Sequence, residues 1–398
     1  MGISKTERDL ILFISNALFS APSTDLVNSD WHAIITEAER QAVLPLLATL
    51  ELIPLEYRET LKKKVSVVIA NNMRVNYNHA ELHELLSSNN VPYVVLKGCA
   101  SASYYPEPTL RTMGDVDFLV SPNDVEKVDE LLKAEGFTPW DANHICHIVY
   151  TRDDAHLEMH FEPAGVPEGK AGEVIREQLS DIFEESRMVE VGGFEMRLPS
   201  HFHHGLILLL HTMHHLTSEG VGLRHLLDWA VFVNNFSDEE FQELFEEKLT
   251  KAGLWRTAQL LTLVSMKYLG ITAKPCAGET GDELLENIIS DILSGGNFGV
   301  KDKERSRAGM IISNRGKGGI GKKNYLFQFF DTLNHIIYTN WPITKRVKLL
   351  LPIGWLFWGV RYQIRVIIGK RKQLNLNRMV SGAEQRGAIY KEFHLYEV

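Results

Sequence analysis

The sequence predicts an α+β protein in which a small mixed β-sheet is flanked by helices. Two observations support this fold class. Short apolar runs at 91–96 and 116–120, followed by alternating residues over 144–162, have the length and period of β-strands. The chain on either side repeats apolar residues every three to four positions, which is typical of amphipathic helices. With 398 residues, 44% of them hydrophobic, the chain can bury substantial cores.

We expect four regions along the chain. Residues 1–90 form a helical N-terminal region, which prolines divide into several helices. Residues 91–198 carry the strand patterns and form the core domain. Residues 199–295 return to helical spacing, and residues 296–398 form a basic C-terminal region.

Two carboxylates mark the start of the second predicted strand. Asp115 and Asp117 flank Val116, and side chains two apart on a strand share one face. Neighbouring carboxylates repel each other unless a cation lies between them, and hydrated Mg²⁺ is the usual cation for oxygen ligands. A lone Asp-x-Asp is more often a turn or cap, but the elements around this pair favour half of a metal site.

A third carboxylate follows the predicted helix at 123–136. The segment 144–162 has the pattern of a hairpin, and Glu158 and His160 share one face of its second strand. Glu158 reaches the Asp115 and Asp117 edge if this hairpin pairs beside it. His160 is expected either to orient Glu158, to touch the acceptor, or to be a structural histidine.

Groups suited to phosphate lie between the first two strands. The first strand ends at Lys97 and Gly98, and a glycine corner lets backbone N–H groups approach a triphosphate at the start of a helix. The planar guanidinium of Arg111 matches phosphate oxygens. Lys97 is equally well read as a solvated strand end.

In this order of elements the chain resembles the polymerase-β-like nucleotidyltransferases, and within them the large bacterial group labelled "nucleotidyltransferase family protein". The resemblance covers roughly residues 31–293. It rests on residues 96–98, Tyr105, Arg111, residues 114–117, residues 136–137, His147, residues 158–160 and residues 222–228.

The resemblance implies an enzyme that moves a nucleoside monophosphate from an NTP, with ATP as the expected donor, to a hydroxyl or phosphate acceptor and releases pyrophosphate. It implies that Asp115, Asp117 and Glu158 bind two Mg²⁺ ions, and that Gly98 helps to hold the triphosphate. Lys97 and Arg111 would contact phosphate. The sequence departs from the family at Cys99, where a second Gly or a Ser is usual, and in a longer gap before Asp115.

Two other classes of function remain open. The chain could keep this fold as a non-catalytic binding or assembly protein, or as an antitoxin-like partner. It could also be a zinc hydrolase, because His211 and His215 are four residues apart on one helical face, although no His-Glu-x-x-His pattern is present. Arg224 and Asp228 nearby would either contact substrate or form a structural polar network. The fold does not choose among small-molecule, peptide and protein acceptors.

The C-terminal region differs from the rest of the chain in charge. Residues 301–398 contain 19 Lys and Arg against 6 Asp and Glu, which leaves 23 against 45 for residues 1–300. The apolar run at 349–360 is too short to span a bilayer, and its basic and aromatic neighbours suit an anionic membrane surface. Docking onto the acidic remainder of the chain is the alternative.

Cysteine content and the amino terminus bear on localisation. The three cysteines are widely spaced and odd in number, which favours a reducing compartment. The first residues lack the pattern of a signal peptide. We therefore expect a cytoplasmic protein without a transmembrane segment, which can lie peripheral to a membrane.

Overall fold

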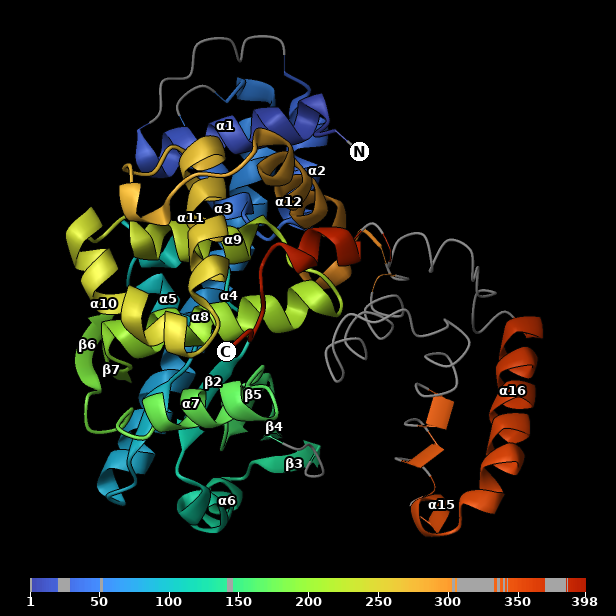
Figure 1. Ribbon diagram of the computed structural model, residues 1–398. Coiled ribbons are helices and arrows are strands. Elements are labelled where there is room, and N and C mark those ends of the chain that lie inside the picture. The colour runs from blue at the N-terminus through green and yellow to red at the C-terminus, as the bar shows by residue number, and fades with distance from the viewer. Residues whose placement is uncertain are drawn as a thin grey trace.

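The computed structural model describes residues 2–20, 29–50, 53–141, 146–302, 305, 333–334, 337–338, 341, 343–368, 384 and 386–398. Most of these residues form helices grouped around one small sheet (Figure 1). The predicted α+β class is confirmed.

The N-terminal helices form the group expected from the sequence. They are α1 (Lys5–Phe19), α2 (Trp31–Arg40), α3 (Leu44–Leu47) and α4 (Leu55–Ser88). A capping box between Ser4 and Glu7 starts α1, and the Asp30 side chain caps α2. The 34 residues of α4 connect two cores, because Leu61 packs with the other N-terminal helices whereas Leu82 packs under the sheet.

The sheet has five strands in the order β1-β2-β5-β4-β3. They are β1 (Tyr93–Val95), β2 (Val116–Val120), β3 (Thr138–Asp141), β4 (His147–Arg152) and β5 (Ala155–His160). Only the β2–β5 pair is parallel; the other three pairs are antiparallel. The predicted hairpin is therefore present as β4–β5, and β5 pairs beside β2, which is the condition under which Glu158 reaches the edge of the aspartates.

Short helical turns and one longer helix, α6, connect these strands. They are α5 (Cys99–Ala102), η1 (Pro108–Leu110), η2 (Pro122–Asp124) and α6 (Val125–Ala134). α7 (Lys170–Gln178) and a separate two-stranded sheet of β6 (Arg187–Val191) and β7 (Phe194–Leu198) follow.

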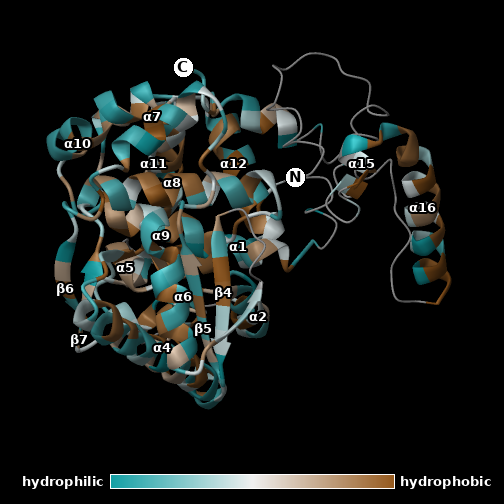
Figure 2. Cartoon of the chain, turned by 90° about the horizontal axis from the view of Figure 1, so that it is seen from below, coloured by the Kyte–Doolittle hydropathy of each residue, from teal (hydrophilic) through white to brown (hydrophobic). Residues whose placement is uncertain are grey.

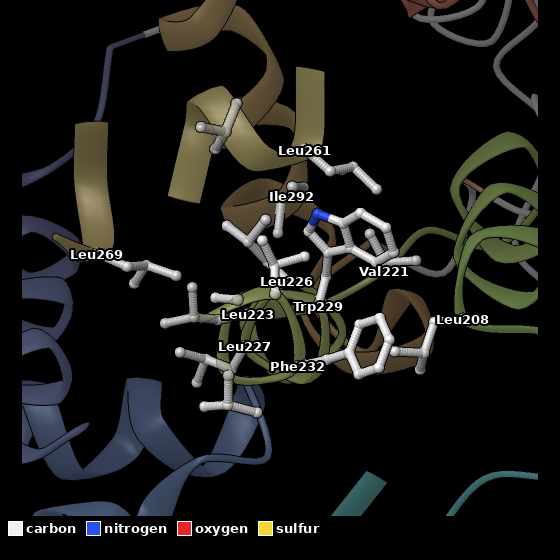
Figure 3. Packing of buried hydrophobic residues seen from close by; sticks show 14 of the residues in the cluster. Leu208, Val221, Leu223, Leu226, Leu227, Trp229, Phe232, Leu261, Leu269 and Ile292 are labelled. Carbon is white, nitrogen blue, oxygen red and sulfur yellow. The ribbon is translucent and has the colours of Figure 1, made fainter. Parts of the chain in front are cut away.

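A helical domain follows the strands. It contains α8 (His201–Thr217), α9 (Leu223–Val233), α10 (Asp238–Lys251), α11 (Trp255–Leu269), η3 (Pro275–Ala277), α12 (Asp282–Gly295) and η4 (Asn297–Gly299). It shares the larger hydrophobic cluster of the protein with the N-terminal helices. Trp229 of α9 packs there among leucines from neighbouring helices, as Figure 3 shows, and donates a hydrogen bond to Thr262.

The end of the chain returns to this helical domain. Phe393 is completely buried, and the Tyr390 hydroxyl donates to the carbonyl of Leu216 at 2.7 Å. The backbone N–H of Tyr396 donates to the carbonyl of Gly253 at 2.9 Å. Residues 386–398 are therefore part of the helical domain.

The described remainder of the predicted region 296–398 contains α15 (Ile343–Arg346), η6 (Lys348–Leu350) and α16 (Leu351–Ile367). Residues 306–332 and 369–383 of that region lie outside the described residues. None of the described helices has the length and apolarity that crossing a bilayer requires.

The burial of Phe393 predicts a large loss of stability when the ring is removed. Phe393→Ala should lower the free energy of unfolding by about 3–5 kcal/mol, because the cavity lies in a packed core. Urea unfolding monitored by circular dichroism measures this loss. Val398→Ala is the control, since Val398 is 49% exposed and should change little. Equal stability of both variants would show that the C-terminal segment does not belong to the folded core.

Candidate functional site

Strand register brings two of the predicted carboxylates together. In the parallel pair of β2 and β5, Asp117 lies directly opposite Glu158. Val116 and Phe118 alternate with Asp117 and are fully buried in the smaller core, which fixes the orientation of the strand. Asp117 and Glu158 are therefore neighbours on one face of the sheet.

His160 completes a compact group with these carboxylates. Ligand atoms of Asp117, Glu158 and His160 all lie within 4.8 Å of one another. The His160 Nε2 atom is 3.1 Å from Asp117 Oδ1 and 3.5 Å from Glu158 Oε2. The two carboxylates of this group are oxygen donors of the kind that fits a divalent cation.

Asp117 is also paired with a lysine. The Lys97 Nζ atom is 2.6 Å from Asp117 Oδ1, and the Asp117 side chain is only 5% exposed. Burial by itself would raise the pKa of Asp117, but Lys97 and the hydrogen bond from His160 outweigh it and hold the pKa well below its usual range. Asp117 is therefore ionised at neutral pH.

Asp115 lies immediately before β2 and experiences the opposite balance of charge. The nearby Asp117 carboxylate, together with burial, raises the pKa of Asp115 to about 6, although Lys97 acts against this shift. Asp115 is not one of the three residues in the compact group. Its raised pKa indicates a position where a cation would relieve repulsion between carboxylates, so the residues present fit a divalent metal.

His160 carries a proton in this arrangement. Burial would lower its pKa, but hydrogen bonds to Asp117, Cys146 and Glu158 raise the pKa to about 10. His79 from α4 behaves differently, because burial lowers its pKa to about 4 and neither ring nitrogen has a hydrogen-bond partner among the described residues. His79 also lies near Asp117, whose charge acts on it.

Gly98 forms the predicted corner between β1 and α5. Its φ of +52° is in the region that favours glycine. A Cβ atom there would lie 3.7 Å from the carbonyl oxygen of Asp115, so backbone conformation, and not lack of space, selects the glycine. Cys99 is buried directly after the corner, and its thiol donates to the Asn76 side chain at 3.0 Å.

Arg111 forms a buried ion pair with the helical domain. Its Nε and Nη2 atoms donate to the two carboxylate oxygens of Asp228 at 2.8 and 2.7 Å. The Tyr105 hydroxyl also donates to Asp228 at 2.9 Å. Of the two roles left open for Asp228, these contacts fit the structural polar network, in which the Asp228 carboxylate binds Arg111 and its charge also acts on Arg224.

Arg224 lies at the start of α9 and faces the approach to β2. Its Nη1 atom donates to the carbonyl of Thr112 at 3.1 Å, and its guanidinium lies 5.3 Å from the centre of the Phe298 ring. The Nε atom has no hydrogen-bond partner among the described residues. The Asp115 carboxylate is one of the charges that act on Arg224. The sequence left the role of Arg224 open. Its contact with Thr112 and its interaction with the Asp115 charge place it near the carboxylates.

The histidine cluster does not form the arrangement of a zinc hydrolase. The rings of His211 and His215 lie 4.4 Å apart, and His215 Nδ1 is 2.6 Å from Glu219. Within the described part of the chain, neither His211 nor His215 belongs to a group of ligand atoms close enough for a metal. Burial lowers the pKa of His211 and of His225 well below the usual value, so both are neutral.

Two other groups of potential ligands are present. Cys146 and His147 approach His160 on the same sheet, and the second group joins His203 to two exposed carboxylates, Asp181 and Glu185. His203 already has hydrogen-bond partners in Ser200 and the carbonyl of Gln178. The His203 group is therefore a weaker candidate than the one at Asp117.

Comparison with known proteins identifies the class. A family described as "Uncharacterised nucleotidyltransferase" matches residues 28–270, which is more than half of the chain. The protein belongs to this nucleotidyltransferase family, and the resemblance predicted from the sequence is confirmed at this level. No curated protein matches the chain.

Two solved structures show distant similarity. A solution structure of the antibiotic-resistance factor ANT(2'')-Ia is 12% identical, with a TM-score of 0.33, and the match covers 46% of this chain and 94% of that chain. A crystal structure of an antigenic nucleotidyltransferase-like protein from Paracoccidioides brasiliensis is 14% identical, with a TM-score of 0.32, over 52% and 97% of the two chains. The class assignment rests on the family match.

The opposite pKa shifts of the two aspartates predict opposite effects on stability. The raised pKa of Asp115 means that its ionisation destabilises the folded protein as the pH rises from about 4 through 6. Asp115→Asn should therefore be more stable than the wild type at about pH 8, and this gain should shrink near pH 4. The measurement is urea unfolding in the presence of a chelator at both pH values.

Asp117→Asn is the matched control. Because the folded-state pKa of Asp117 lies below its unfolded value, its charge contributes stability that is present above about pH 4. Loss of the Asp117 charge should destabilise the protein at about pH 8. If both variants were destabilised equally at high pH, the repulsion inferred for Asp115 would be wrong.

Proposed function

We propose that the protein is a Mg²⁺-dependent nucleotidyltransferase that moves a nucleoside monophosphate from an NTP, with ATP as the expected donor, to a hydroxyl or phosphate acceptor. The direct pairing of Asp117 with Glu158, beside Asp115, is the observation that carries this proposal. Family membership supports the transferase class. The identities of the metal, the nucleotide and the acceptor are proposed in addition to that class.

The three carboxylates would hold the metal. Two Mg²⁺ ions, when bound, would activate the acceptor oxygen and neutralise the departing pyrophosphate. Asp117 would contribute a fully ionised ligand at the start of the reaction, because its pKa is held low. Glu158, whose side chain is 26% exposed, would hold the cation nearer the acceptor or accept the proton of the acceptor hydroxyl.

Lys97 links the carboxylates to the phosphate contact predicted from the sequence. Its Nζ atom is paired with Asp117, and a cation bound by Asp117 would compete for the same carboxylate oxygen. We propose that Lys97 then donates to phosphate oxygens, since its stem begins next to Gly98 at the predicted triphosphate corner. Lys97 would thus pair with Asp117 in the absence of metal and contact phosphate when metal and nucleotide are bound.

Arg224 is a second cationic side chain proposed to bind the triphosphate. Arg111 binds Asp228 through two of its nitrogens, so its phosphate contact stays a prediction, whereas the Nε atom of Arg224 has no hydrogen-bond partner among the described residues. An arginine over an aromatic ring beside a metal site is suited to a polyphosphate. We propose that Arg111 and Asp228 fix α9 and that Arg224 binds the nucleotide.

Binding of a non-hydrolysable ATP analogue tests the proposal without the acceptor. Isothermal titration should show binding that requires Mg²⁺, and Asp117→Ala should weaken it about 100-fold or more because a metal ligand is lost. Asp154→Ala is the control, because Asp154 lies on the same hairpin as Glu158 but its side chain is 84% exposed. Binding that ignores Mg²⁺ and the Asp117 substitution would favour the non-catalytic binding or assembly protein.

The role of Arg224 has its own test. Arg224→Ala should weaken binding of the same analogue about tenfold or more, because a charge-assisted hydrogen bond is removed. Binding of Mn²⁺ alone, followed by electron paramagnetic resonance, should not weaken. Arg256→Ala, which removes an arginine of α11 whose Nη2 atom donates to the Thr280 hydroxyl, should leave both unchanged. Equal affinities of the Arg224 and Arg256 variants for the analogue would contradict this role.

A further inference from the structure

Helix α16 carries an apolar stripe that the described part of the chain leaves largely exposed. The stripe follows helical spacing and consists of Ile353, Leu356, Phe357, Val360, Ile364 and Ile367, which are 44% to 81% exposed. Positions three and four apart lie on one face of a helix, so these side chains form one continuous surface. Figure 2 shows brown residues along this helix, with teal between them.

The opposite face of α16 is already occupied. A Cβ atom on Gly354 would lie 2.9 Å from the Ile337 side chain, so the backbone of the helix packs closely against that residue. The Trp355 indole donates to Asn334 at 2.8 Å. Local packing thus buries one side of the helix and turns the apolar stripe outward.

The exposed apolar surface of the protein is concentrated here. Twenty large hydrophobic residues are exposed in the described part of the chain, and ten of them lie within residues 343–368. Scattered exposed hydrophobic residues are ordinary, but a continuous patch marks a surface that binds something.

The segment of sequence that contains the stripe carries charge of one sign. Residues 332–383 contain nine Lys and Arg and no Asp or Glu. Arg361 and Arg365 follow the stripe along one edge of α16, and the Arg361 guanidinium lies 4.8 Å from the centre of the Trp358 ring. A partner for this surface therefore combines an apolar interior with negative charge at its boundary.

Aromatic residues gather at the same place. Three of the seven tryptophans of the chain are Trp341, Trp355 and Trp358, and Phe357 and Tyr362 lie on the same helix. Tryptophan and tyrosine favour the boundary between lipid headgroups and acyl chains, because their rings are apolar with one polar group.

We propose that α16 lies in the surface of an anionic lipid membrane, with its apolar stripe among the acyl chains and its arginines at the phosphate headgroups. The helix has 17 residues, and no described helix meets the requirements for spanning a bilayer, so it would lie parallel to the membrane plane. The membrane would hold the nucleotidyltransferase domain near acceptors at that surface.

Two other occupants fit less well. A second copy would bring two segments of the same positive charge together, and like charges oppose such contact. The acidic residues 1–300 would attract the arginines but would have to cover an apolar stripe with a charged surface. An anionic bilayer offers an apolar interior to the stripe and negative charge to the arginines.

Co-sedimentation of the full chain with vesicles tests this proposal. The protein should pellet with vesicles of phosphatidylcholine and phosphatidylglycerol in equal parts, and much less with pure phosphatidylcholine. Raising NaCl from about 0.1 M to about 1 M should release part of it, because salt screens the headgroup charge. A blue shift of tryptophan fluorescence should accompany binding, since indoles would enter a less polar surrounding.

Two double variants separate the apolar contribution to membrane binding from the ionic contribution. Leu356→Glu with Val360→Glu should reduce vesicle binding about tenfold or more, because the buried apolar area is lost. Arg361→Glu with Arg365→Glu should remove the preference for phosphatidylglycerol. Leu55→Glu with Val67→Glu is the matched control, since these residues are 79% and 70% exposed on α4 and should not affect binding.

The outcomes decide between the occupants. Wild-type protein that stays in solution with both vesicles, or that binds both equally and without salt dependence, would overturn the proposal. A mass in light scattering that corresponds to a dimer and falls to a monomer in the Leu356 and Val360 variant would assign the stripe to a second copy. The ATP-analogue titration should be unaffected by all three variants, which keeps this test separate from that of the active site.

Discussion

The parallel pairing of β2 with β5 is the constraint on which the site depends. It sets Asp117 opposite Glu158, and a shift by one residue would turn one of these side chains into the smaller hydrophobic core. That core prevents the shift, because Val116 and Phe118 are fully buried on the other face. Burial of the apolar face of β2 therefore fixes the direction of its polar face. The same burial keeps the carboxylates close together although they repel each other.

A second constraint joins the sheet to the helical domain. The bidentate pair of Arg111 and Asp228 is buried, and Tyr105 adds a third hydrogen bond to the same carboxylate. Removing one partner of such a pair leaves a buried charge unpaired, which costs far more than the intact pair contributes. The pair thus fixes the orientation of α9 against the segment that precedes β2. Arg224, one turn before Asp228 on α9, is held beside that segment as a consequence.

The sequence predicted those features that depend on local periodicity. Alternation over two residues predicted the hairpin that carries Glu158, and helical spacing predicted α8 and α9. The shared face of Asp115 and Asp117 stays a prediction, because Asp115 lies just before β2. The partners of charged residues could not be predicted in this way. Arg111 and Asp228 are 117 positions apart, and many carboxylates would satisfy an arginine equally well. Burial of Phe393 in the helical domain was also hidden, because a short apolar segment does not specify its distant contacts.

The charges at the site explain why metal and nucleotide should bind together. Asp115, Asp117 and Glu158 face two cations, protonated His160 and Lys97, so the group retains about one negative charge. One divalent ion would reverse that sign, and two would leave a strongly positive site to which Arg224 adds. Such a site is stable only when a polyanion completes it, and a nucleoside triphosphate supplies that charge. Metal without nucleotide should therefore bind weakly, and nucleotide without metal should be repelled by the carboxylates.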